Sequence, residues 1–130
     1  MKTRLITFIF VLFATISFAQ STSQPPTQNI STDSNVVYRL FSTRNIYTFI
    51  KLNTRNGQMC QVQWDTKSNQ FETPISLTTR ISKEDETNGR FFLYPTTNIY
   101  NFILLDQIDG RVWQVQWSTE VKDRMVIPIY

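Results

Sequence analysis

Runs of aromatic and β-branched residues, separated by short polar segments, follow one another from residue 36 to the end of the chain. They cover residues 36–41, 47–53, 58–65 and 71–75, and again residues 91–94, 100–106, 111–118 and 125–129. Runs of this length, bounded by Asn, Asp, Gly and Pro, are typical of β-strands. Asn56-Gly57 and Asp109-Gly110 separate the two middle runs of each set, as expected for hairpin turns in which Gly adopts the left-handed conformation.

The pattern occurs twice, at an offset of 53 residues. Residues 40–66 and 93–119 share 14 identities in 27 positions, including a Gln-Val-Gln-Trp motif in each copy. Self-similarity at a fixed spacing indicates a structural repeat. We expect a single β domain over residues 36–130, made of repeat 1 (36–76) and repeat 2 (90–130), which are joined by a polar connector (77–89).

A three-residue turn over residues 55–57 would set the register of the first hairpin. It would place Leu52 opposite Cys60 and Ile50 opposite Val62, on an almost wholly apolar face that has to be buried. The two repeats together are long enough for one compact domain but hardly for two. The predicted fold is therefore all-β, with two tandem antiparallel meander repeats of three to four strands each. We expect them to pack apolar face to apolar face, as a pseudo-two-fold sandwich or a small barrel.

In this register the other face of each hairpin carries aromatic rings opposite glutamine amides. The side chains concerned are Tyr47, Phe49, Gln61 and Gln63 in repeat 1, and Tyr100, Phe102, Gln114 and Gln116 in repeat 2. Rings supply contact area and amides supply orientation, so this surface suits a glycan, an extended peptide or a protein partner. The alternative is a solvent-facing pleat whose rings pack on a neighbouring strand, a pattern that duplication alone would make occur twice.

The start of the chain predicts export. Lys2 and Arg4 precede a short apolar run, and small side chains follow it, which is typical of a secretory signal peptide over residues 1–19. The run is too short to cross a bilayer, although an uncleaved anchor is the alternative. Residues 20–35 contain one aliphatic residue and no aromatic one, which predicts a disordered tether. We expect a periplasmic or secreted protein.

The charge of the chain argues against binding to nucleic acid. The chain has 13 basic and 10 acidic residues, and loss of Lys2 and Arg4 with the signal peptide leaves 11 and 10. No Lys/Arg cluster remains that would follow a phosphate backbone. We expect neither nucleic-acid binding nor a membrane span after signal cleavage.

Catalysis and metal binding are poorly supported. The chain lacks histidine, the commonest general base and zinc ligand. Cys60, the only cysteine, is expected to be a buried apolar residue rather than a reactive or intermolecular thiol. Asp106 and Asp109 are spaced like calcium ligands, but Asn53 and Asn56 replace them in repeat 1 and still form the turn. We expect no metal, no cofactor and no catalytic residue; a glycosidase that uses a carboxylate pair is the enzymatic alternative.

The hairpin that ends at Trp113 carries the motif Leu-Asp-x-x-x-Gly-x-Val-Trp. It resembles the middle strands of propeller blades of the quinoprotein and WD-repeat types, and is similar to repeats in uncharacterised small exported bacterial β-repeat proteins. The resemblance covers one hairpin per copy and implies an antiparallel meander. Two blades cannot close a propeller, so a more extensive likeness would require several chains to complete the ring.

Three functions are compatible with the sequence. The first is an exported, non-catalytic binding module that presents the aromatic and glutamine face. The second is a structural subunit that associates with further copies of itself into a homo-oligomer. In this reading Pro128 would prevent strand pairing at one edge of the sheet. The third is a small glycoside-active enzyme.

Overall fold

The computed structural model describes residue 31 and residues 33–130. The predicted signal peptide and most of the predicted tether lie outside the described residues. The described part contains eight strands and two single-turn 3₁₀ helices: β1 (Tyr38–Ser42), β2 (Thr48–Asn53), β3 (Met59–Gln63), β4 (Phe71–Ser76), η1 (Lys83–Asp85), β5 (Phe91–Pro95), β6 (Asn101–Asp106), β7 (Val112–Gln116), η2 (Val121–Asp123) and β8 (Met125–Ile129). No helix among the described residues has the length and apolar character needed to span a membrane.

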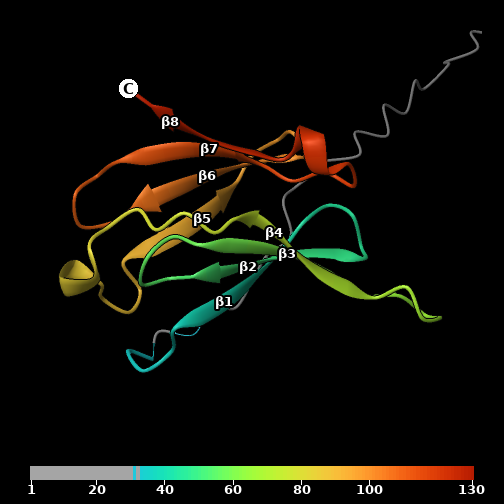
Figure 1. Ribbon diagram of the computed structural model, residues 1–130, viewed down its shortest axis with the longest axis horizontal. Helices are drawn as coiled ribbons and strands as arrows, with labels where there is room; N and C mark the ends of the chain where they lie inside the picture. The colour runs from blue at the N-terminus through green and yellow to red at the C-terminus, as the bar shows by residue number, and fades with distance from the viewer. Residues whose placement is uncertain (1–30, 32) are drawn as a thin grey trace, which may run out of the picture.

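The strands form two antiparallel meanders, one for each repeat. The first sheet has the order β1-β2-β3-β4 and the second the order β5-β6-β7-β8, so every strand pairs with its neighbours in sequence. Figure 1 shows the two sheets stacked as layers, and β2 lies against β5 while β4 lies against β8. The predicted all-β fold with two tandem meanders is confirmed, and neither described sheet closes into a barrel.

One hydrophobic core lies between the sheets. Its buried members come from both repeats: Phe41, Ile50, Leu52, Met59, Phe91, Leu93, Phe102, Leu104, Trp113, Val115 and Trp117. Backbone contacts reinforce the packing, because the amide of Phe91 at the start of β5 donates to the carbonyl of Thr54 at 2.8 Å. Neither sheet could bury its apolar side chains alone, so the fold depends on their contact.

The register predicted for the hairpins is wrong by one residue. Asn53 pairs with Gln58 across a four-residue turn, and the amide of Gly57 donates to the carbonyl of Asn53 at 2.9 Å. Leu52 therefore lies opposite Met59, not opposite Cys60. A slip of one residue moves every side chain of the second strand to the other face of the sheet.

The two repeats bury opposite faces. In repeat 1 the buried side chains of β2 are Thr48, Ile50 and Leu52, whereas in repeat 2 the buried residues of β6 are Phe102, Leu104 and Asp106. At the offset of 53, the second set corresponds to positions 49, 51 and 53, which alternate with the first set along β2.

The sandwich is consequently assembled head-to-tail. A two-fold axis would bury equivalent residues from the two repeats, and the predicted pseudo-two-fold relation requires this. Instead, Phe41 is buried and its equivalent Tyr94 is exposed, while Leu93 is buried and its equivalent Leu40 is exposed. The relation between the sheets is that of successive units in a repeat array, in which one side of each unit contacts the opposite side of the next.

Candidate functional site: two outer sheet faces

The eight residues predicted to form one aromatic and glutamine surface do not share a face. In repeat 1, Tyr47 and Phe49 lie on the outer face, while Gln61 and Gln63 point toward the other sheet. In repeat 2 the arrangement is reversed, with the two aromatic residues on the inner side and the two glutamines outside: Tyr100, Phe102, Gln114 and Gln116. The prediction that rings and amides stand opposite one another is wrong, because it rests on the slipped register.

The glutamines also have different environments. Gln61 is fully buried between the sheets, and neither its amide nitrogen nor its amide oxygen has a hydrogen-bond partner among the described residues. Its equivalent Gln114 donates to Oδ1 of Asn101 at 2.8 Å, and Gln116 donates to the carbonyl of Asp123 at 2.8 Å. None of these three amides is therefore both exposed and free to orient a ligand.

A Tyr–Trp pair occurs at the same place in each repeat. The ring centroids of Tyr47 and Trp64 are 5.1 Å apart, and those of Tyr100 and Trp117 are also 5.1 Å apart. The indole N–H of Trp64 donates to the carbonyl of Ile46, and the indole N–H of Trp117 donates to the carbonyl of Ile99, the equivalent residue. The local structures match, yet Trp64 is 44% exposed and Trp117 is 1% exposed. The difference arises because repeat 1 covers Trp117 while nothing in the described chain covers Trp64.

The outer face of repeat 1 is a mainly apolar surface along β1, β2 and β3. Pairing across the strands brings together Leu40 with Lys51, and Phe49 with Val62. We define this face by five apolar or aromatic residues, Tyr38, Leu40, Phe49, Val62 and Trp64. Lys51, Cys60 and Glu72, which carry ionisable side chains, lie among them on the same face. Leu40 is 51% exposed, whereas its buried equivalent Leu93 in repeat 2 is completely covered.

An ion pair crosses this face. Nζ of Lys51 contacts the carboxylate of Glu72, and the ammonium group also lies 5.7 Å from the ring centroid of Tyr38. The hydrogen bond between them raises the pKa of Lys51 and lowers the pKa of Glu72, so both groups stay charged. The positive charge of Lys51 and the negative charge of Glu72 cancel, so the pair adds no net charge to the face.

Cys60 lies on the same face, half-buried and opposite Lys51. It was expected on the apolar core face, and the register slip explains why that position is wrong. Burial raises the pKa of its thiol, and the nearby Glu72 carboxylate acts in the same direction. A thiol held protonated in this way is a poor nucleophile.

The outer face of repeat 2 is the second uncovered surface. We define it by the outward side chains of β5 to β8: Tyr94, Ile103, Leu105, Val112, Gln114 and Ile127. Tyr94 is 44% exposed, whereas its equivalent Phe41 is 1% exposed within the sandwich. Neither outer face was predicted from the sequence, since the slipped register placed Val62 and Trp64 of repeat 1, and Ile103 and Leu105 of repeat 2, on the core face.

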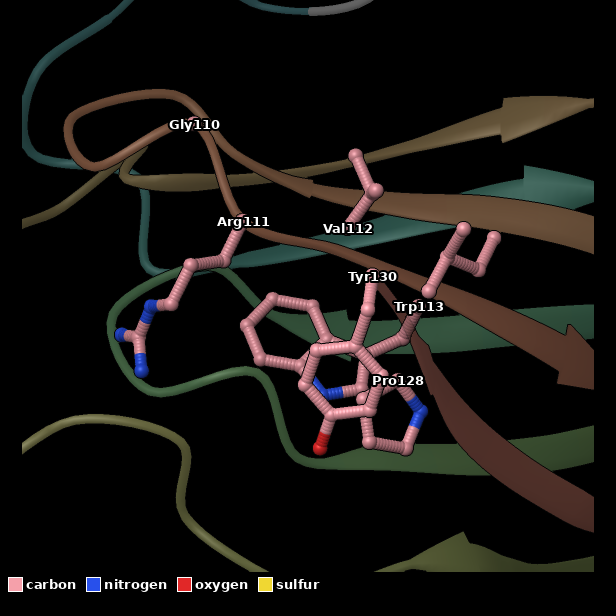
Figure 2. Close-up of a pocket in the computed structure, with 7 residues that line it drawn as sticks. Gly110, Arg111, Val112, Trp113, Pro128 and Tyr130 are labelled. Atoms are coloured by element: carbon pink, nitrogen blue, oxygen red, sulfur yellow. The ribbon is translucent and has the colours of Figure 1, made fainter.

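A cleft of about 460 Å³ opens at the end of β7 and β8. Figure 2 shows its lining residues, which come from the β6–β7 turn, β7 and the chain end: Gly110, Arg111, Val112, Trp113, Pro128, Ile129 and Tyr130. The Arg111 guanidinium lies 5.4 Å from the Trp113 indole, and it already pairs with Asp106 at 3.1 Å. The guanidinium of Arg111, the cationic group of the cleft, is therefore already paired with groups of the fold itself.

A pair of carboxylates in repeat 2 has the wrong electrostatics for acid catalysis. Arg90 contacts both Asp106, at 3.0 Å, and Asp109, at 2.8 Å. Burial raises the pKa of Asp106, but hydrogen bonds from Arg90, from two backbone amides and from Arg111 outweigh it and lower the pKa to about 2. A glycosidase general acid needs a raised pKa, so this network is structural. No group of three metal-ligating side chains occurs in the part of the chain that the structure describes.

Comparison with known proteins adds no relative. No protein-family model matches the chain, and the searches of curated proteins and of solved structures gave no significant match. The candidate site therefore rests on geometry: two large, mainly apolar sheet faces, at opposite ends of a two-unit stack.

Proposed function

We propose that this chain is an exported, non-catalytic interaction module whose outer sheet faces bind a protein partner. The observation that carries the proposal is the set of exposed apolar side chains on the outer face of each sheet, the face that the other sheet does not cover. Exposed apolar patches that span several strands mark interaction sites in proteins. Tyr38, Leu40 and Trp64 supply such a patch on repeat 1, and Tyr94 and Ile127 do so on repeat 2.

The chemistry of the faces favours a protein over a glycan. Sugar recognition needs convergent hydrogen-bonding groups beside a ring, and the amides of Gln114 and Gln116 are already bonded within the chain. What remains accessible is aromatic and aliphatic side chains around one neutralised ion pair. Such a surface matches the desolvated centre of a protein–protein interface.

Hydroxyl-radical labelling tests the proposal. Labelling is measured by mass spectrometry on the dilute purified chain and on the chain in its native compartment. We expect Tyr38, Trp64 and Tyr94 to be modified in dilute solution and protected in the compartment. Ile108 is exposed on the β6–β7 turn, outside both faces, so it should be modified equally in the two samples. Equal labelling of the face residues in both samples would contradict the proposed function.

A further inference from the structure

The interface inside the molecule has two different sides. One side is the inner face of repeat 1, where Phe41, Ile50 and Leu52 are buried. The other is the inner face of repeat 2, where Leu93 and Trp117 are buried. Direct contacts also join the two repeats: Phe41 packs edge-to-face against Phe92 on the edge strand β5, and Arg124 donates a hydrogen bond to Thr73 at 3.0 Å.

The outer face of repeat 2 reproduces the first side. At the offset of 53 residues, Ile103 corresponds to Ile50 and Leu105 to Leu52, with identical side chains. Four further positions keep their character: Tyr94 stands for Phe41, Asn101 for Thr48, Val112 for Met59 and Gln114 for Gln61. Two others become more apolar, since Phe92 replaces Arg39 and Ile127 replaces Thr73. A surface that the molecule buries in one repeat is therefore presented to the outside in the other.

The outer face of repeat 1 reproduces the second side. Leu40, Phe49, Val62 and Trp64 are identical to the buried residues at positions 93, 102, 115 and 117, and Tyr38 stands for Phe91. The uncovered Trp64 also has the same ring geometry as the covered Trp117. This face therefore keeps most of the side chains that the internal partner contacts, with Cys60 in place of the larger Trp113 as the main difference in shape.

The two charged replacements on this face compensate each other. Lys51 occupies the position of Leu104, and Glu72 occupies that of Val126 after the one-residue shift in the last strand. A single charge at either position would oppose burial. Because Lys51 and Glu72 contact each other, the pair can be covered without leaving an unpaired charge.

We propose that the protein partner is a second copy of this chain, which docks the outer face of its repeat 2 on the outer face of repeat 1. This inference rests on the proposed function and names its partner. The contact repeats, between molecules, the interface that each molecule contains. It is heterologous, so it continues from chain to chain and generates either a closed ring or an open filament. A ring of four to eight such sheets would take two to four chains.

Two variants break one face each. Leu40→Glu places a charge on the outer face of repeat 1, and Tyr94→Glu places one on the outer face of repeat 2. Both residues are exposed in the single chain, so the substitutions should leave its fold intact, which near-UV circular dichroism verifies. Ile108→Glu is the matched control, because it also replaces an exposed apolar residue but on the β6–β7 turn.

Molar mass is measured by light scattering across a concentration series. We expect the wild type and Ile108→Glu to form assemblies of two or more chains, and Leu40→Glu and Tyr94→Glu each to remain monomeric. An equimolar mixture of the two monomeric variants should form a complex of two chains, because each variant retains the face that the other lacks. Only a head-to-tail contact predicts this complementation.

Three results would overturn the inference. They are a wild type that is monomeric at every concentration, an assembly that survives both single substitutions, and a mixture that remains monomeric. The failure of this inference is separable from the failure of the proposed function. Face residues that are protected from radicals in the native compartment, in a chain that never self-associates, would leave the proposed function standing with a different protein as partner.

Discussion

At the scale of single residues, the most constrained group in the molecule is the carboxylate of Asp106. It is fully buried, and it accepts hydrogen bonds from Arg90 and Arg111 as well as from the amides of Ile108 and Asp109. These contacts tie the strand before the hairpin, the turn and the start of β7 together. In repeat 1 the positions equivalent to Asp106 and Arg90 are occupied by Asn53 and Val37. Neither of these side chains is charged, so the network exists only in repeat 2.

The lowered pKa of Asp106 predicts a specific loss of stability in acid. Its pKa is about 2 in the folded chain and about 3.9 in an unfolded one. The ionised group therefore contributes about 2 to 3 kcal/mol, which is fully present above pH 4 and is lost as the pH falls toward 2. We expect Asp106→Asn to lower the free energy of unfolding by about 3 kcal/mol or more at pH 7, since it leaves Arg90 without its buried partner.

Urea denaturation between pH 7 and pH 2 measures this effect. The difference in free energy of unfolding between the wild type and Asp106→Asn should shrink as the pH falls below 4. Asp109→Asn is the control, because Asp109 also contacts Arg90 but is half exposed, and its cost should be smaller. A difference that stays constant over the whole pH range would show that the ionised carboxylate does not stabilise the fold.

At the scale of elements, the two hairpin turns occupy equivalent positions in the two repeats, but different residues surround them. Gly57 and Gly110 both have positive φ, +81° and +75°. A Cβ at position 57 would lie 3.1 Å from Cδ of Arg80 and 3.4 Å from the ring of Phe91, whereas a Cβ at position 110 would meet nothing within 4 Å. The turn of repeat 1 is packed under the second sheet, and the turn of repeat 2 is open.

Alanine substitution should therefore cost more in repeat 1. Both Gly57→Ala and Gly110→Ala force a side chain into left-handed backbone, which costs about 1 to 2 kcal/mol. Gly57→Ala should cost about 1 to 3 kcal/mol more, because Phe91 is fully buried and Arg80 is held by its hydrogen bond to the Gly57 carbonyl. Urea denaturation of the two variants in dilute solution measures the difference, and equal losses would contradict the packing described for Gly57.

The element scale also shows how far the sequence could predict the fold. The positions of the strands, the duplication and the meander pairing could all be read from the runs of aromatic and β-branched residues and from the Asn-Gly and Asp-Gly turns. The register could not, because an Asn-x-x-Asn-Gly segment is compatible with turns of three and of four residues. Pairing of Asn53 with Gln58 decides between them, and this one-residue difference moved Gln61 from the predicted binding surface to the core.

At the scale of the whole molecule, the limit of sequence reasoning is that identical segments occupy different environments. Gln-Val-Gln-Trp occurs in both repeats, yet Trp64 is exposed while Trp117 is buried. No property of the motif itself distinguishes the two copies. What distinguishes them is the order of packing, in which repeat 1 has a neighbour on one side and repeat 2 has a neighbour on the other, and only the three-dimensional arrangement shows that order.

The dependence of each repeat on its neighbour predicts that the chain can be divided and reassembled. Cleavage between Lys83 and Glu84, which are both exposed, gives one fragment per repeat. Each fragment alone would leave a broad apolar face in water, and single units of a repeat array rarely fold by themselves. We expect neither fragment to show native near-UV circular dichroism, and an equimolar mixture to recover it.

Tryptophan fluorescence can follow this reassembly from one side of the interface. With Trp64→Phe in the first fragment, all tryptophan emission comes from Trp113 and Trp117, which are buried in the intact chain. Their emission should shift to shorter wavelength when the first fragment is added, because the inner face of repeat 1 then excludes water from both indoles. If the second fragment alone already emits at the wavelength of the intact chain and does not respond to its partner, repeat 2 folds independently. The contact between opposite faces would then not be what stabilises the fold, and the basis for stacking chains through the same contact would be lost.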